Sequence, residues 1–366
     1  MSLPWVAFDS IASLDGDCAN GAEPDIAGIG VVLSFLIASF MTTSASILAM
    51  LLDQAFDSKG HFNLRAPLTY FREHFVENQW KKHYAWRPFL DPLIIGFGDQ
   101  QLVTGYAVLL TGWIKVAQAT FRVQSAHFVL ILYICALSSS SHLAALITLR
   151  KYFRKYKFIA KVRIGLVVLF AVFLLASMLA TIIMPPVLIT DDKGKEMGPG
   201  SHFQKFVFLA LLLLIFIGVS TALVCILHDP DDRRRRDSPA SLPSSSSRRY
   251  LIRYLIHRVM DPEKAENGIS RLYLYPARLG WRLVCLLFLT PSVAFVVQNL
   301  LANVSAVLVL TQKFVKPEDQ GKFCGLQGDE ENVWGFGQML SVVMLLLPVL
   351  MAAQTYLEAR HEIFES

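Results

Sequence analysis

The chain of 366 residues is 54% hydrophobic and only 17% charged, with a formal net charge of +5. This composition is typical of an integral membrane protein and excludes an ordinary water-soluble domain. Seven separate apolar runs are each long enough to cross the hydrocarbon core as a helix, which takes about 20 residues. In chain order they cover about 26–52, 100–119, 126–149, 162–187, 203–228, 280–302 and 333–353. The sequence therefore predicts an all-α, polytopic membrane protein with seven transmembrane helices.

Lysine and arginine gather in the segments after the first, third and fifth runs, whereas residues 1–25 contain five carboxylates and no basic residue. Because basic loops remain on the cytoplasmic side, this distribution predicts an N-out/C-in topology. Residues 1–25 would form a lumenal or extracellular tail, and residues 354–366 a cytoplasmic one. Residues 1–25 also lack the basic and apolar regions of a cleavable signal, so we expect the first helix to act as an uncleaved anchor.

Two polar segments between the predicted helices have contrasting compositions. Residues 229–249 combine aspartates, serines and four consecutive arginines, which predicts a disordered basic cytoplasmic loop that contacts anionic lipids. Residues 61–92 mix basic side chains with Trp80, Tyr84 and Trp86, as expected for an amphipathic segment at the membrane interface. Topology and solubility account for both segments without a catalytic role.

Two cysteines, Cys18 and Cys324, fall on the predicted non-cytoplasmic side, one before the first helix and one before the seventh. An oxidising lumen permits a disulfide between them, which would join the N-terminal tail to the last outer loop. The alternative is two unpaired surface thiols. Cysteines within the predicted helices, such as Cys135, are expected to be small apolar packing residues.

Signatures of several enzyme classes are absent from the sequence. It contains no HExxH motif, no P-loop, no GxSxG and no Rossmann glycine pattern in a suitable context. The aspartates at 229–237 are interrupted by four arginines, which argues against a magnesium site there. We therefore expect neither a metal nor a cofactor.

Polar residues within the predicted spans are the main candidates for function, because an ionisable group in lipid is costly. Asp99, Gln100 and Gln101 begin the second helix, and His142 lies in the third. At 1.5 Å per residue, Asp99 and His142 both fall near the cytoplasmic edge of the bilayer. Lys115 and His127 both fall near the outer edge by the same calculation. Two polar layers are thus expected between these neighbouring helices.

Each of these residues also has a structural explanation. Asp99 can stabilise the start of a helix through the helix dipole. Gln100 and Gln101 can hydrogen-bond to neighbouring helices, and the serines at 138–141 permit close packing. Lys115 can extend its amine towards the interface.

The entrances to the first and seventh helices resemble each other, because both have carboxylates followed by glycines. Residues 23–30 read Glu-Pro-Asp-Ile-Ala-Gly-Ile-Gly, and residues 330–338 read Glu-Glu-Asn-Val-Trp-Gly-Phe-Gly-Gln. An outer-face pocket lined by Asp25, Trp334 and Phe336 is one interpretation. Aromatic anchoring at the membrane interface is the other.

Three segments carry a resemblance to a broad family of fungal multi-pass membrane proteins. They are Asp-Ile-Ala-Gly-Ile-Gly at 25–30, Asp-Gln-Gln-Leu-Val-Thr-Gly at 99–105 and Trp-Gly-Phe-Gly-Gln at 334–338. The chain departs from many relatives at Gly98, where Ser is expected. In size and helix number it is also similar to the membrane terpene cyclases of ascofuranone- and ascochlorin-type meroterpenoid pathways. That second resemblance implies an enzyme acting on an epoxidised farnesyl chain attached to an aromatic polyketide.

The leading hypothesis is a membrane terpene cyclase that closes an epoxidised prenyl chain by acid-initiated carbocation chemistry. Apolar surroundings favour the protonated form of a carboxylic acid, which can then open the epoxide, and aromatic faces can stabilise the developing cation. Asp99, His142 and Asp25 are the catalytic candidates, with Asp99 preferred as the acid. The candidate substrate contacts are Gln100, Gln101, Trp113, His127, Trp334 and Phe336.

The expected partners are a lipophilic prenylated aromatic epoxide, membrane lipids and other pathway enzymes, but not nucleic acid. The endoplasmic reticulum or another endomembrane is the expected location, with the plasma membrane as the alternative. The main alternative function is a non-enzymatic seven-helix protein, either a receptor-like sensor or a small-molecule transporter. Polar layers between the second and third helices would then form a ligand or proton path.

Overall fold

The computed structural model describes residues 6–7, 23–55, 86–118, 125–149, 157–184, 189–190, 196–197, 201–227, 291–315, 326 and 332–365. Seven candidate spans in it are long and apolar enough to cross a membrane, which confirms the predicted seven-helix membrane architecture. The helices are α1 (Pro24–Ala27), α2 (Ile29–Ala55), α4 (Trp86–Ala117), α5 (Ala126–Thr148), α7 (Lys157–Ile183), α8 (Ser201–Leu227), α12 (Pro291–Phe314), α13 (Phe336–Val343) and α14 (Leu346–Glu365). A short antiparallel pair, β1 (Ile189–Thr190) and β2 (Glu196–Met197), lies between α7 and α8.

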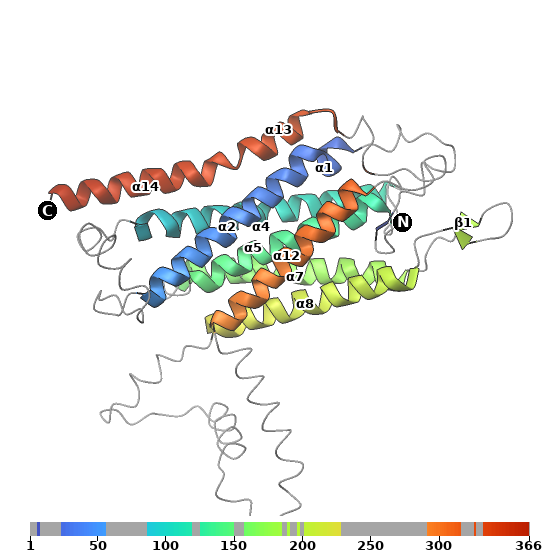
Figure 1. Ribbon diagram of the computed structural model, residues 1–366, viewed down its shortest axis with the longest axis horizontal. Coiled ribbons are helices and arrows are strands. Elements are labelled where there is room, and N and C mark those ends of the chain that lie inside the picture. Colours follow the sequence, from blue (N-terminus) through green and yellow to red (C-terminus); the bar gives the residue numbers. More distant parts are fainter. Residues whose placement is uncertain are drawn as a thin grey trace, which may run out of the picture.

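Helix α5 is the centre of the bundle. Every residue of α5 is buried, and the helix contacts α2, α4, α7, α8 and α12 (Figure 1). Its first turn is capped by Ser125, whose hydroxyl accepts a hydrogen bond from the Phe128 amide. By contrast, α13 packs on α2, and α14 packs on α4 at the edge of the bundle. Side chains on α5 therefore face neighbouring helices rather than lipid.

Val6 and Ala7 lie at one end of this bundle, and the end of α14 lies at the other (Figure 1). At the N-terminal end, α1 begins, α4 ends, α5 begins and α13 begins. At the C-terminal end, α4 begins, α5 ends, α7 begins and α14 ends.

Glycines recur every seven residues along α4, at positions 98, 105 and 112, and they bring α4 close to α5. An added Cβ at these positions would lie 2.9, 2.7 and 2.9 Å from the nearest α5 atom. Those atoms are, in the same order, Ala145 Cβ, Ser138 Oγ and Ile131 Cδ1. The α5 partners also recur every seven residues, in the opposite direction. Lipid tails give no hydrophobic drive for helix association, so close packing at small residues is what joins α4 to α5.

The residue after each glycine instead contacts α7. Asp99 accepts a hydrogen bond from Arg163, Tyr106 Oη donates to the Leu166 carbonyl at 2.7 Å, and Trp113 Nε1 donates to Ser177 Oγ at 2.8 Å. Residues seven apart lie on nearly the same face of a helix. One face of α4 therefore packs on α5 through glycines, of which Gly105 also lies against Phe170 of α7, while the adjacent face is hydrogen-bonded to α7.

The second span begins earlier than predicted. We expected a helix from 100 and an interfacial segment over 61–92, but α4 starts at Trp86 and contains Pro92. Pro92 removes only a hydrogen bond to the first turn, so the helix continues through it. The added turns have a partner, because Phe89 contacts Tyr356 edge-on and Pro348 lies against Gly96. Helix α14 thus packs against the first turns of α4, which belong to the span.

The sixth span extends further towards the C-terminus than predicted. Helix α12 runs to Phe314 rather than ending at 302. Two of its polar side chains are hydrogen-bonded to other segments: Gln298 Nε2 donates to the Gly218 carbonyl at 2.9 Å, and buried Lys313 donates to the Leu326 carbonyl. Hydropathy counts such side chains against a span, although hydrogen bonds to the protein make them acceptable there.

The seventh span is discontinuous. Helix α13 ends at Val343, a turn follows at Met344 and Leu345, and α14 continues to Glu365. Pro348 cannot donate a backbone hydrogen bond to Met344, which explains the break. Residues 354–365 are helical, so the predicted C-terminal tail is a continuation of the seventh span.

Part of the predicted N-terminal tail is docked into the bundle. Val6 and Ala7 are buried, and the Ala7 amide donates to Gln312 Oε1 at 3.0 Å. Gln312 Nε2 in turn donates to the Ala7 carbonyl at 2.6 Å. One buried amide on α12 therefore satisfies both backbone groups of Ala7, which fixes the tail at the N-terminal end.

Candidate functional site

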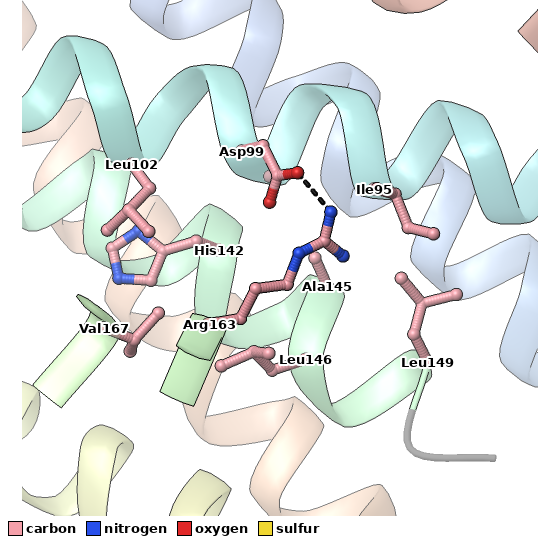
Figure 2. A pocket seen from close by; sticks show the side chains of 10 residues that line it. Ile95, Asp99, Leu102, His142, Ala145, Leu146, Leu149, Arg163 and Val167 are labelled. Carbon is pink, nitrogen blue, oxygen red and sulfur yellow. Dashed lines mark hydrogen bonds and ion pairs between the residues drawn. The ribbon is translucent and has the colours of Figure 1, made fainter. Parts of the chain in front are cut away.

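A small pocket at the C-terminal end collects charged and polar side chains from three spans. Its lining consists of Ile95, Gly98, Asp99, Leu102, His142, Ala145, Leu146, Leu149, Arg163 and Val167 (Figure 2). Helix α4 contributes Asp99, α5 contributes His142 and α7 contributes Arg163. The comparison of helix depths predicted that Asp99 and His142 would be level, and the structure brings both into this pocket. The remaining lining is mostly aliphatic.

Asp99 and Arg163 form an ion pair across the mouth of the pocket. The Arg163 guanidinium donates to Asp99 Oδ2, as the dashed line in Figure 2 shows. The Asp99 side chain is 48% exposed and that of Arg163 is 19% exposed. The pair therefore faces outward, towards the lipid or its headgroups, rather than into the bundle. A charge within a span is costly alone, and the opposite charge offsets that cost.

His142 lies deeper and is enclosed. It is only 3% exposed, and neither ring nitrogen has a hydrogen-bond partner among the residues that the structure describes. A neutral imidazole offers one donor and one acceptor, and a buried polar group normally has its partners. The pocket next to His142 is therefore suited to a ligand group that can both donate and accept a hydrogen bond.

The Phe170 ring lies beside His142. It contacts the His142 ring edge-on, with centroids 5.3 Å apart, and on another side it contacts the Tyr106 ring at 5.0 Å. Phe170 is fully buried. Phe170 therefore holds the imidazole in place, and the two aromatic rings lie behind the residues that line the pocket.

The pocket itself has a volume of about 20 Å³, room for one water-sized group. A prenyl chain does not fit into it in this conformation. Access for a larger ligand requires the helices that line the pocket, α4, α5 and α7, to move apart.

Gln100 and Gln101 lie next to Asp99 on α4 and differ in their contacts. Gln101 is 2% exposed, and its backbone carbonyl accepts a hydrogen bond from Ser138 Oγ at 2.6 Å. The side-chain oxygens of both glutamines are buried without a partner among the described residues. The structural explanation, hydrogen bonding between α4 and α5, thus applies to the backbone of Gln101 and leaves its side-chain oxygen available.

The candidates at the N-terminal end form a separate group, and Asp25 has a structural role there. An added Cβ at Gly337 would lie 2.5 Å from Asp25 Oδ1, so the carboxylate lies against the first turn of α13. The α13 N-cap, Gly335, provides no side-chain hydrogen bond. A carboxylate at that position is favourable to the helix dipole. Trp334 and Phe336 are 53% and 82% exposed, so they lie on the surface rather than around a closed pocket.

Gln338 joins the entrances of the first and seventh spans. Its side chain is buried, accepts a hydrogen bond from the Gly30 amide at 2.9 Å and donates to the Val333 carbonyl at 2.8 Å. An added Cβ at Gly28 or Gly30 would come within 2.4 and 2.8 Å of this side chain. The glycines of both segments thus permit the close approach that the sequence indicated.

The remaining sequence candidates are also at the N-terminal end. Lys115 pairs with Glu23 at 2.5 Å, which joins the end of α4 to the start of α1. His127 is buried in the first turn of α5. Trp113 lies about 21 Å along α4 from Asp99 and bonds to Ser177. The structure therefore does not bring Trp113 or His127 to the pocket with Asp99.

The predicted disulfide lies outside the described residues, because neither Cys18 nor Cys324 is among them. The same applies to residues 61–85 and to the basic loop at 229–249. Cys135 is buried and free. Within the described ranges, no group of three His, Cys, Asp or Glu side chains could hold a metal ion.

Arg163 is the residue that sequence reasoning missed. It was counted among the basic loop charges that define topology, although α7 begins six residues earlier, at Lys157. The available signal was its position: Arg163 lies at the start of an apolar run, at the same end of the bundle as Asp99. An opposite charge at matching depth is the partner that an intramembrane carboxylate needs.

Comparisons with known proteins give no further identification. No family model matches the chain, no curated protein matches it significantly, and no solved structure does so either.

Proposed function

We propose that this chain is a membrane terpene cyclase that closes the epoxidised prenyl chain of a lipophilic meroterpenoid, with its site between α4, α5 and α7. The single observation that carries the proposal is the pocket of Asp99, Arg163 and His142, which lies within the spans and is otherwise apolar. The similarity in size and helix number to the ascofuranone- and ascochlorin-type cyclases is what suggests this class. The segments at 25–30 and 334–338, which resemble a fungal membrane protein family, lie together at the N-terminal end and stabilise the fold.

In this proposal Asp99 is the acid. Once protonated, its carboxyl group transfers the proton to the epoxide oxygen while one carbon–oxygen bond breaks and a tertiary cation forms. A double bond of the same chain attacks the cation and closes the ring. Loss of a proton to the Asp99 carboxylate then ends the reaction, so the product is an isomer of the substrate.

The neighbouring residues have supporting roles. His142 would bond to a hydroxyl group of the substrate through its two ring nitrogens. Tyr106 and Phe170 provide aromatic rings near the pocket, which favour a developing cation. Asp99 accepts a hydrogen bond from Arg163 in this conformation. It must therefore leave Arg163 before it can donate a proton.

The topology and location belong to the same proposal. We place the N-terminus in the lumen or outside and the C-terminus in the cytosol, in the endoplasmic reticulum or another endomembrane, with the plasma membrane as the alternative. The substrate would reach the site through the lipid, and other enzymes of the pathway would supply the prenylated aromatic epoxide.

A second candidate function is a non-enzymatic sensor or small-molecule transporter. The observation in its favour is the pocket volume of about 20 Å³, which accommodates a water-sized group and would suit a proton path. A charge pair at the mouth of such a pocket can change between bonded and separated states. Neighbouring genes for a prenyltransferase and an epoxidase would favour the cyclase instead.

Incubation of membranes with an epoxidised prenyl-phenol tests the proposed activity. Membranes that contain the protein should convert the epoxide to an isomer of unchanged mass, detected by liquid chromatography and mass spectrometry. Membranes from cells without the protein are the control. The same assay is repeated with a panel of related prenylated aromatic epoxides. If every epoxide remains unchanged in both kinds of membrane, the result would favour the sensor or transporter.

A further inference from the structure

We propose that the pocket binds one water molecule between Asp99 and His142, and that the site adds this water to the epoxide as a second reaction. The inference rests on the proposed function only in taking the epoxide as the substrate. It adds a bound water, a base for that water, and a product that differs in mass from the cyclised isomer.

The size and the polar lining of the pocket fit a single water molecule. Its volume is about 20 Å³, and a buried water needs room for about one probe sphere and two to four polar partners. Asp99 and His142 both face this space (Figure 2). Both ring nitrogens of His142 are buried without a hydrogen-bond partner among the described residues. Of the Asp99 carboxylate, only Oδ2 is hydrogen-bonded within the described ranges, to Arg163.

The two partners of the water lie at different depths. His142 is 3% exposed and forms the floor of the pocket, whereas the Asp99 side chain is 48% exposed and lies at its mouth. A water between them can donate one hydrogen to Asp99 Oδ1 and the other to the acceptor nitrogen of the imidazole. Its oxygen lone pairs are then directed away from both partners and remain available to a reactive carbon at the mouth.

The resting state of Asp99 is that of a base. The hydrogen bond from Arg163 to Oδ2 favours the ionised carboxylate, which accepts a proton rather than donating one. The ion pair remains intact during water addition, whereas cyclisation requires Asp99 to leave Arg163. The prenyl chain also remains in the lipid, because only one epoxide carbon has to reach the mouth. The small pocket volume is therefore no obstacle to this reaction.

The addition of water balances without a further reactant. The water oxygen bonds to one epoxide carbon while the bond between that carbon and the epoxide oxygen breaks. One water proton passes to Asp99 Oδ1, and Asp99 then donates this proton to the alkoxide that has formed at the mouth. The carboxylate is thereby restored. The product is a diol with the mass of the substrate plus one water molecule.

Incubation in water labelled with heavy oxygen tests this inference. Membranes that contain the full chain receive the epoxidised prenyl-phenol, and the products are separated by liquid chromatography and identified by mass spectrometry. We expect a diol that carries one labelled oxygen atom, whereas the cyclised isomer takes up no oxygen from water. Membranes without the protein measure the background of spontaneous and endogenous hydration.

Three variants test the base and the position of the water. Asp99→Asn should lower diol formation by about 100-fold or more, as for the loss of a general base. His142→Phe keeps an aromatic ring beside Phe170 but removes a polar partner of the water, so the diol should fall to background. Val167→Ile adds a methylene group to the pocket lining and should have the same effect without changing a polar group. Val172→Ile is the matched control, because Val172 is an exposed residue of the same helix.

The abundance and thermal stability of each variant are measured in the same membranes after solubilisation. Diol at background in the wild type would overturn the inference, as would wild-type diol formation in both His142→Phe and Val167→Ile. The outcome is separable from that of the cyclase. Isomer without the labelled diol would retain the cyclase and reject the addition of water. Labelled diol without the isomer would retain the addition of water and reject the cyclase.

Discussion

Asp99 is the residue on which the proposed chemistry depends, and its environment has two opposing features. A charged side chain within a span is costly, by roughly 2.5–3.5 kcal/mol at the centre of the span and by less near its end, where Asp99 lies. Arg163 offsets part of that cost through an ion pair that is only partly shielded from the surroundings. The pair therefore stabilises the resting structure while remaining able to open.

The first prediction concerns the acid. Asp99→Asn keeps the size of the side chain but removes the transferable proton, so cyclisation should fall by about 100-fold or more and the epoxide should accumulate. Protein abundance in membranes should not change. Product and substrate are measured by mass spectrometry, with the exposed Glu358 as a matched carboxylate control in Glu358→Gln.

Asp25 was the alternative acid, and Asp25→Asn distinguishes the two. The Asp25 carboxylate lies against the first turn of α13 at the other end of the bundle, so Asp25→Asn should retain turnover. Full turnover by Asp99→Asn together with an inactive Asp25→Asn would move the site to the N-terminal end. Full turnover by both variants would exclude both carboxylates as the acid.

At the scale of helices, α4 organises the bundle through its repeat of a glycine followed by a polar or aromatic residue. The repeat is visible in the sequence as Gly98-Asp99, Gly105-Tyr106 and Gly112-Trp113. It joins α4 to α5 by close packing and to α7 by hydrogen bonds. The position of Gly98 beside Asp99 thus has a packing reason, because an added Cβ would meet Ala145 at 2.9 Å.

The second prediction tests this close packing. In Gly105→Ala the new methyl group would lie 2.7 Å from Ser138 Oγ and 3.0 Å from Phe170 Cζ. The change should lower the free energy of unfolding by about 1–3 kcal/mol, as overpacking does. Gly165→Ala on α7 is the matched control, because no described atom lies within 4 Å of its added Cβ. Thermal unfolding in detergent measures both, and equal stability of the two variants would contradict the account.

The third prediction concerns the junction between the first and seventh spans. Gln338→Leu leaves the Gly30 amide and the Val333 carbonyl without their partner, which should cost about 1–3 kcal/mol of stability. Gln354→Leu removes an exposed side-chain pair with Glu358 and should have little effect. The comparison uses the same thermal unfolding assay. A Gln338→Leu variant as stable as the wild type would show that this contact does not hold the two spans together.

The helices could be predicted from the sequence where they are uniformly apolar, and less well where polar residues have partners. The fourth and fifth spans, α7 and α8, agree closely with the prediction because both are strongly apolar. The end of α12 was predicted too early because Gln312 and Lys313 are polar, although each is hydrogen-bonded to residues outside the helix. Local hydropathy contains no information about such partners.

The site was predictable in part for a related reason. Counting residues along two antiparallel helices placed Asp99 and His142 at one depth, and this follows from helix geometry alone. Arg163 could not be assigned as their partner, because that requires knowing that α7 packs beside α4. Trp113 and His127 were candidate substrate contacts, but both lie at the N-terminal end, so their depth separates them from the pocket.

At the scale of the whole molecule, the unequal distribution of basic residues leads to the fourth prediction. A reporter fused after Ser366 should face the cytosol, and one fused at Met1 should face the lumen or the exterior. Glycosylation and protease-protection reporters at each end provide the measurement. Seven spans require the two ends to lie on opposite sides, and the reversed orientation would place the Asp99 pocket near the lumen.

The polar side chains at the two ends of the bundle differ in whether they have hydrogen-bond partners. At the N-terminal end, Glu23, Asp25, Gln312 and Gln338 form contacts that fix the chain entrances. At the C-terminal end, His142 and the side chains of Gln100 and Gln101 have buried polar atoms without a described partner. Polar groups that are already paired hold the fold, whereas unpaired ones near a pocket are the better candidates for contact with a ligand.

The most direct test of the central claim is an experimental structure of the protein with a bound unreactive substrate analogue, such as a prenyl-phenol that lacks the epoxide. We expect its density between α4, α5 and α7, with the hydroxyl group at His142 and the Asp99–Arg163 contact broken. Density for the analogue at the N-terminal end instead, beside Asp25 and Trp334, with the Asp99–Arg163 pair intact, would contradict the account.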